Sequence, residues 1–286
     1  MAPGQPGSRL AAPADLAEAQ LAQSRRRLSA AEVTAAALAD SALYTSVEVV
    51  ARTGSTNADL LAAARAGAPA GSVLVAEEQT AGRGRLDRRW QSAPGTALTF
   101  SMLLRPAAVP PARRGWLPLL TGVAVVAALS ARVAAVSLKW PNDVLANSGK
   151  LAGILAEQTG DGIVVGIGLN VGATREQLPS EHATSLWLAG AVDLNRQAIL
   201  LAVLREFERW YQPWAAEAAA GDADASGVRA AYVAACATLG RDVRVELPGG
   251  RVLVGLASDV DAAGRLLVSA VDGVHAISAG DVIHVR

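Results

Sequence analysis

The stretch SLKWPNDVLANSGKLAGILAEQTGDGIVVGIGLNV, residues 137–171, consists of short apolar segments separated by turn-forming residues. The segments are SLKW (137–140), VLAN (144–147), KLAGILAEQ (150–158) and GIVVGIGLNV (162–171). Each break between them is short and contains Pro, Asn, Asp, Ser or Gly. Because breaks this short join neighbouring strands that run in opposite directions, the stretch predicts an antiparallel meander.

Strand and helix patterns also precede this stretch. VEVVAR (47–52) is typical of a strand, and TNADLLAAARAG (56–67) of a helix capped by Ser55. Two further strands are expected at SVLVAEEQ (72–79) and TALTFSMLLR (96–105), on either side of the arginine-rich stretch, the second alternating between faces. We therefore predict an α+β fold with a mixed, mainly antiparallel sheet packed on helices.

The segment GWLPLLTGVAVVAALSA (115–131) is apolar but shorter than the roughly 20 residues that a membrane span needs, so we predict a buried helix. Two more helices are expected within 194–220 and 226–240. From Arg241 onward, short strands at 241–247, 251–260, 265–273 and 282–286 predict a small β-barrel. We therefore expect an N-terminal extension (1–45), a main domain (46–236) and a C-terminal barrel (237–286).

Composition limits the function classes. Half of the residues (51%) are hydrophobic, and 26 basic residues balance 26 acidic ones, so no net field attracts nucleic acid or a membrane surface. Cys236 is the only cysteine, which excludes an internal disulfide, and we expect it to be buried as a small apolar side chain. Residues 1–16 carry no secretory-signal pattern, so we expect a cytoplasmic protein.

The stretch AEEQTAGRGRLDRRW (76–90) gathers four arginines around two glycines. Gly82 and Gly84 allow the backbone to approach a ligand closely, and Arg83 and Arg85 offer two-pronged hydrogen bonds to phosphate or carboxylate. The pattern is neither a P-loop nor a Rossmann turn. It predicts an anion-binding loop, with an ordinary solvated surface loop as the alternative.

Other polar positions allow two interpretations each. Asn142 and Asp143 form a turn or reach a ligand, and Lys150 neutralises developing negative charge beside Gly153 or simply extends into solvent. GSTN (54–57) binds a polar ring or only caps a helix. The glycines of GIGLN (166–170) leave room for a flat ligand or only ease packing.

Taken together and in this order, GSTN, EEQTAGRGR, KWPNDV, GKLAGIL, GIGLNV and a small β-barrel resemble the biotin protein ligases over about residues 46–286. The resemblance implies an α+β catalytic domain followed by an SH3-like barrel. It also implies a two-step reaction: biotin and ATP form biotinyl-5′-AMP and pyrophosphate, and a lysine of a biotin carboxyl carrier domain then takes the biotinyl group.

Site residues follow from the same resemblance. Catalysis is assigned to Lys150, Arg83 and Arg85. The biotin-binding positions are Ser55, Thr56, Asn57, Gln79, Gly82, Arg83, Gly84, Arg85, Lys150, Gly153, Gly166 and Gly168. The nucleotide-binding positions are Arg88, Trp90, Asn142, Asp143 and Asn170. Mg²⁺ is expected on the phosphates, with Asp143 as the candidate protein ligand.

The sequence departs from the family at two places. Leu86 and Asp87 stand where the family commonly has glycine two residues beyond GRGR, which predicts a stiffer loop. Some members carry an N-terminal winged helix-turn-helix, whereas residues 1–45 lack that pattern, so we expect a monofunctional ligase without a DNA-binding domain. The partners are then a carrier domain of an acyl-CoA carboxylase, and neither nucleic acid nor membrane. A lipoate-type ligase and a biotin-responsive DNA-binding regulator are the alternatives.

Overall fold

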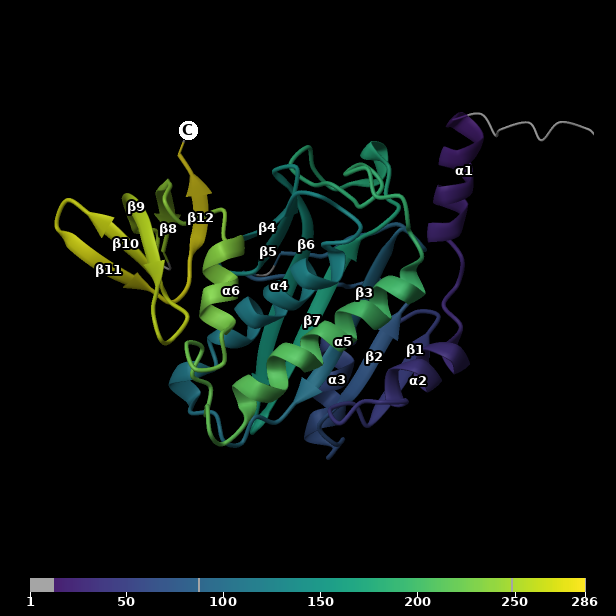
Figure 1. Cartoon of the computed structure of the whole chain (residues 1–286), viewed down its shortest axis with the longest axis horizontal. Helices are drawn as coiled ribbons and strands as arrows, with labels where there is room; N and C mark the ends of the chain where they lie inside the picture. The colour runs from purple at the N-terminus through teal and green to yellow at the C-terminus, as the bar shows by residue number, and fades with distance from the viewer. Residues whose placement is uncertain (1–12, 87, 248, 286) are drawn as a thin grey trace, which may run out of the picture.

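A large mixed sheet forms the centre of the molecule (Figure 1). The computed structural model describes residues 13–86, 88–247 and 249–285, and within them seven strands pair in the order β1-β2-β3-β7-β6-β5-β4. The strands are β1 (Ser46–Val50), β2 (Ser72–Ala76), β3 (Ala97–Leu104), β4 (Val136–Lys139), β5 (Asp143–Ala146), β6 (Gly149–Thr159) and β7 (Gly162–Asn170). All neighbours are antiparallel except β1 and β2, and β4 to β7 form the predicted meander.

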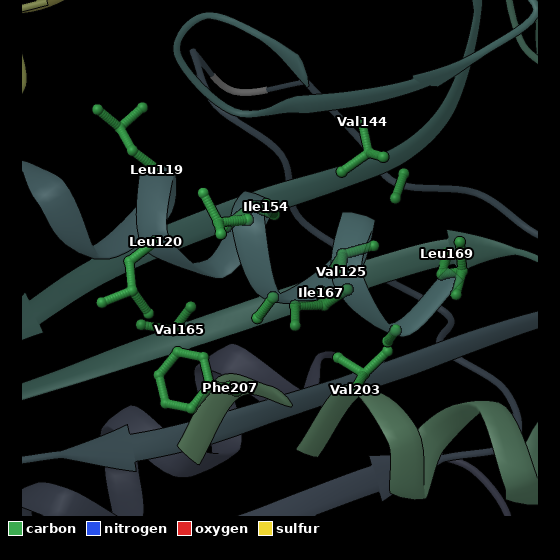
Figure 2. Packing of buried hydrophobic residues seen from close by; sticks show 14 of the residues in the cluster. Leu119, Leu120, Val125, Val144, Ile154, Val165, Ile167, Leu169, Val203 and Phe207 are labelled. Atoms are coloured by element: carbon green, nitrogen blue, oxygen red, sulfur yellow. The ribbon is translucent and has the colours of Figure 1, made fainter. Parts of the chain in front are cut away.

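Helices cover both faces of this sheet. They are α1 (Pro13–Ser24), α2 (Ala30–Leu38), α3 (Thr56–Arg65), α4 (Trp116–Leu129), α5 (Arg196–Ala215) and α6 (Val228–Ala235), with 3-10 turns at Pro111–Arg113 and Arg175–Gln177. The helices α4 and α5 pack on one face, where Leu120 and Phe207 lie near Val165 (Figure 2). Helix α3 packs on the opposite face through a separate apolar cluster. The expected α+β class is confirmed.

Strand β3 is buried on both faces of the sheet. All eight of its residues are buried, because Phe100 and Met102 lie in the core cluster with α4 and α5, and Leu103 lies in the α3 cluster. A strand covered on both faces loses the alternation that marks a half-exposed strand. Helix α4 is buried along most of its length, as predicted, and in the described part of the chain no helix has the length and apolarity needed to cross a membrane.

The C-terminal residues form a second antiparallel sheet, in the order β11-β10-β9-β8-β12. Its strands are β8 (Asp242–Glu246), β9 (Val252–Val260), β10 (Leu266–Ala270), β11 (Gly273–Ile277) and β12 (Asp281–His284). The sequence pattern had not separated β11 from β10. Two buried tryptophans attach this sheet to the main domain, because Trp116 Nε1 donates to Ala262 O (3.0 Å) and Trp140 Nε1 to Gly264 O (3.1 Å).

The described part of the N-terminal extension packs on the main domain. Helix α2 lies against β1 and α5, and Val33 is fully buried. Arg196 of α5, only 2% exposed, donates to the carbonyl oxygens of Ser24 (2.6 Å) and Arg26 (2.8 Å). It also pairs with Glu77 at 2.7 Å. Buried contacts between distant parts of the chain therefore hold this segment. Cys236 is buried and free, as expected.

Candidate functional site

A cavity of about 490 Å³ lies between strands β6 and β7 of the main sheet, the arginine-rich loop and the start of β12. Its lining includes nearly every position assigned from the sequence: Ser55, Thr56, Asn57, Gln79, Arg83, Gly84, Arg85, Arg88, Trp90, Asn142, Asp143, Lys150, Gly153, Gly166, Gly168 and Asn170. Gly82 lies beside the cavity, and a Cβ there would approach the carbonyl oxygen of Trp90 to 2.5 Å. The fold thus gathers residues that are more than 100 positions apart.

The polar end of the cavity is built on the start of α3. Ser55 caps this helix by accepting from Ala58 N, so its hydroxyl hydrogen remains available to a ligand. Gln79 Oε1 accepts from Thr56 N at 2.8 Å, and no hydrogen bond within the described residues uses Gln79 Nε2. This part of the cavity therefore offers hydrogen-bond donors and acceptors from the start of α3 and from Gln79. Ser55 can cap the helix and still donate its hydroxyl hydrogen to a ligand.

The arginine-rich loop (82–90) is a tight hairpin. Gly84 N donates to Arg88 O at 2.7 Å, and Trp90 N donates to Gly82 O at 2.9 Å. Leu86, which replaces the family's glycine region, has φ of +52° and is 61% exposed. A leucine in the left-handed region costs about 1–2 kcal/mol relative to glycine, so the departure introduces strain at the tip. Asp87, the second departure, lies outside the described residues.

The arginines of this loop have partners on three different elements. Arg83 pairs with Glu157 of β6 (3.1 Å), and Arg88 pairs with Asp281 of β12. Arg85 donates to Asn142 Oδ1 (2.9 Å) and to Gly280 O (3.3 Å). Burial lowers the pKa of the Arg85 guanidinium, although Asp281 and Asp143 oppose that shift. The loop therefore connects the main sheet to the C-terminal sheet across the cavity.

Both lysines of the chain line this cavity, whereas its other 24 basic residues are arginines. Lys150 Nζ lies 2.6 Å from Asp143 Oδ1, with the Lys150 side chain 39% exposed. Lys139, which sequence reasoning did not select, is partly buried. Burial lowers the pKa of Lys139, Asp143 raises it and Lys150 lowers it further. A compact ammonium group at each position brings positive charge close to a bound anion.

The glycines of β6 and β7 make room for protein side chains in this structure. A Cβ at Gly168 would lie 2.3 Å from the Trp90 ring, and one at Gly153 would lie 3.3 Å from it. A Cβ at Gly166 would lie 2.0 Å from Asn57 Oδ1. Trp90 therefore covers bare strand backbone, and its buried Nε1 has no acceptor among the described residues.

The two asparagines assigned to the nucleotide side have backbone partners. Asn142 Nδ2 donates to Ile154 O (2.9 Å), and the buried Asn170 donates to Thr184 O (2.9 Å). Asn142 also receives the hydrogen bond from Arg85, so it links β6 to the loop. Each asparagine thus fixes the cavity wall.

Sequence reasoning missed Ser101, Glu157, Lys139 and Asp281. Ser101 is fully buried in β3 and Glu157 belongs to β6, so only the sheet register brings them to α3 and the loop. Asp281 approaches the loop through the packing of the C-terminal sheet. Lys139 offered a signal, since it precedes the Trp-Pro-Asn-Asp turn directly.

The donor set fits a phosphate-held Mg²⁺ ion with little help from the protein. The described residues contain no group of three or more His, Cys, Asp or Glu side chains arranged to hold a metal. Asp143 provides one carboxylate on the cavity wall, beside Lys150. Mg²⁺ commonly takes one or two carboxylates plus substrate phosphates, and Asp143 fits that pattern.

Comparison with known proteins shows similarity along most of the chain. Residues 49–173 match the Biotin/lipoate A/B protein ligase family, and residues 238–285 match the Biotin protein ligase C terminal domain. A biotin–[acetyl-CoA-carboxylase] ligase of Mycobacterium tuberculosis is 44% identical over 84% of this chain and 89% of that protein. A bifunctional ligase/repressor of Bacillus spizizenii is 31% identical over 75% of this chain and 66% of that protein. The structure of a biotin protein ligase from Aquifex aeolicus in complex with biotin and ATP is 29% identical, with a TM-score of 0.68, over 85% of this chain and 100% of that one.

Proposed function

Because the chain belongs to the Biotin/lipoate A/B protein ligase family, we propose that it activates biotin with ATP and attaches it to a lysine of a biotin carboxyl carrier domain. The acceptor is the carrier domain of an acyl-CoA carboxylase. The observation that carries the proposal is a single cavity lined by two kinds of group. Lys150 and the loop arginines supply positive charge, and the start of α3 supplies neutral polar groups.

In the first step, a carboxylate oxygen of biotin attacks the α-phosphorus of ATP, and the bond to pyrophosphate breaks. Negative charge gathers on the carboxylate, the α-phosphate and the leaving group. Lys150, Arg83 and Arg85 stabilise that charge from positions already fixed by Asp143, Glu157 and Asn142. Asp143 would hold a Mg²⁺ ion bound to the phosphates, and that ion would supply further charge neutralisation there.

In the second step, the amine of the acceptor lysine attacks the carbonyl carbon of the mixed anhydride. An amide forms, AMP leaves and the amine loses a proton. The anhydride also reacts with water, so the loop must cover it until the acceptor arrives. The hairpin formed by residues 82–90, held at the cavity mouth by Glu157 and Asp281, is the segment that provides this cover.

The ring of biotin fits the polar end of the cavity. Its ureido carbonyl and N–H groups require both donors and acceptors, which Ser55, Thr56 and Gln79 supply. Trp90 lies on Gly153 and Gly168 and also lines the cavity. We assign residues 46–236 to the catalytic domain and 237–286 to the C-terminal domain, and we place the protein in the cytoplasm, where ATP is present and Cys236 stays reduced.

Two alternatives predict different results. A lipoate-type ligase would bind lipoate, whose ring differs from that of biotin. The match of residues 238–285 to the biotin ligase C-terminal domain favours biotin. Pyrophosphate release measured with ATP and either biotin or lipoate separates them, and release with lipoate alone would overturn the proposal. A DNA-binding regulator would need a surface for DNA, yet α2 packs against β1 and α5. A salt-dependent gel shift on genomic fragments tests that alternative.

A further inference from the structure

A chain of buried hydrogen bonds runs along the floor of the cavity, from the polar end toward the arginine-rich loop. Thr56 Oγ1 lies 2.7 Å from Ser101 Oγ, and Ser101 donates to Asn57 Oδ1 at 2.6 Å. Asn57 Nδ2 then donates to Glu157 Oε2 at 2.8 Å, and Glu157 Oε1 pairs with Arg83 Nη1 at 3.1 Å. Glu157 is therefore the one link of this chain that contacts both Asn57 and the loop.

The Glu157 carboxylate and the Leu155 carbonyl oxygen together fix the orientation of Asn57 and so the direction of the Asn57–Ser101 hydrogen bond. An ionised carboxylate only accepts, so Asn57 must turn its NH₂ group toward Glu157 and its oxygen toward Ser101. Ser101 then gives its only hydroxyl hydrogen to Asn57. Ser101 Oγ then has only lone pairs to offer Thr56, so the single hydroxyl hydrogen of Thr56 goes either to Ser101 Oγ (2.7 Å) or to Gln79 Oε1 (3.1 Å). In both cases Thr56 Oγ1 keeps a lone pair that can accept from a ligand N–H.

Both polar atoms of the Asn57 side chain already have protein partners. Its NH₂ group donates to Glu157 and also to Leu155 O (3.2 Å), and its oxygen accepts from Ser101. The side chain is buried, with 4% of the residue exposed. The resemblance had assigned Asn57 to biotin binding, but these contacts favour a role as a connector beneath the ligand.

We propose that Glu157 is a positioning residue that acts through Asn57 and Arg83. One oxygen fixes the hydrogen-bond direction at the ring end of the cavity, and the other holds the first loop arginine over the same cavity. The Glu157 side chain is 20% exposed, so its pairing with Arg83 is less screened than a fully exposed ion pair. This inference rests on the proposed ligase function.

The substitution Glu157→Gln tests the idea with little change in shape. The amide has one accepting oxygen and one donating NH₂ group, so it cannot accept from both Asn57 and Arg83. We expect kcat/KM for biotin in pyrophosphate release to fall about tenfold. In an Arg83→Ala background the same substitution should lower kcat/KM by about threefold or less, because the Arg83 side chain, one of the two that Glu157 contacts, is already absent.

Asp161→Asn is the matched control. Asp161 lies between β6 and β7 and pairs with Arg105 at 2.7 Å. The substitution therefore removes one carboxylate from the same hairpin at a residue that does not line the cavity. We expect this variant to keep wild-type kinetics. Equal losses from Glu157→Gln in the wild-type and Arg83→Ala backgrounds, or no loss at all, would overturn the proposal.

Limited trypsin digestion provides a readout that does not depend on activity. Without ligand, Glu157→Gln should be cut faster after Arg83 than wild type and Asp161→Asn, while melting temperatures stay within about 4 °C. Unchanged cleavage would overturn the proposal even if no ligase activity were found. Accelerated cleavage in a protein that shows no biotin-dependent pyrophosphate release would instead support the contact and refute the proposed function.

Discussion

At the scale of single residues, the charges of the cavity are held in pairs before any ligand enters. Lys150 faces Asp143, Arg83 faces Glu157 and Arg88 faces Asp281. These carboxylates keep the cations in place, and they must share them with the phosphates of ATP when it binds. Electrostatic stabilisation depends on groups that are already oriented when charge develops, which these pairs provide.

Lys150→Ala removes the cation that the account places nearest the reacting carboxylate and α-phosphate. We expect the rate of biotinyl-AMP formation to fall by at least about 100-fold, because the lost charge matters most in the transition state. Single-turnover formation of labelled biotinyl-AMP measures it. Arg209→Ala, which removes an exposed cation on α5, is the control and should retain full activity. Near wild-type rates for Lys150→Ala would refute the assignment.

At the scale of elements, the sequence predicted most strands and helices but not the contacts between distant ones. Alternation and turn residues were sufficient for β4 to β7, since each neighbour in the sheet is also a neighbour in sequence. Strand β11 was missed because the turn that separates it from β10 is only two residues long. The positions of Ser101 and Glu157 depend on sheet register, and the position of the segment between α1 and α2 depends on Arg196, which local patterns do not reveal.

Arg196→Met tests how the N-terminal segment is held. The substitution leaves Glu77, whose side chain is 14% exposed, without its cation, and removes the hydrogen bonds to Ser24 and Arg26. Breaking a buried pair in this way costs about 3–5 kcal/mol, so the free energy of unfolding in urea should fall by about that amount. Arg209→Met on the same helix should change it by no more than about 0.5 kcal/mol. Equal values for the two variants would contradict the packing described here.

The arginine-rich loop should become resistant to trypsin when ligands bind. The ion pairs that hold Arg83 and Arg88 involve arginine side chains at least half exposed, and such pairs stabilise a loop only weakly. Biotinyl-AMP supplies a further counter-charge together with an apolar surface to close on. We expect cleavage between Gly82 and Trp90 without ligand, and protection by biotin with ATP and Mg²⁺ together. Biotin alone should protect partially and ATP alone least. Cleavage after the exposed Arg251 serves as the internal control, and equal loop cleavage in all conditions would exclude closure.

At the scale of the whole molecule, the C-terminal sheet completes the site. Gly280 and Asp281 contact the arginine-rich loop, and His284 lies 3.2 Å from Thr238 Oγ1, which accepts in turn from Trp140 N. The Trp140 side chain also donates to Gly264 at the far end of this sheet. The two sheets therefore share a polar seam beside Trp140, which itself lines the cavity.

The seam makes stability depend on pH. Burial, with Lys139 and Arg241, lowers the pKa of His284 to about 4, compared with about 6.5 in an unfolded chain. Between these values the unfolded chain binds more protons, so the free energy of unfolding should decrease as pH falls from about 6.5 to about 4. Melting temperatures of wild type and His284→Gln across this range measure the effect. The variant should lose less stability on acidification, and identical pH profiles would exclude His284 as the cause.

Transfer of labelled biotin to a recombinant biotin carboxyl carrier domain tests the central claim most directly. The full chain is incubated with ATP, Mg²⁺ and the acceptor, and the label on the acceptor is followed over time. We predict transfer that requires ATP, that disappears when the target lysine of the acceptor is replaced by Arg, and that falls by at least about 100-fold with Lys150→Ala. Folded wild-type protein that leaves the acceptor unlabelled, or that labels it with lipoate and not with biotin, would contradict the account.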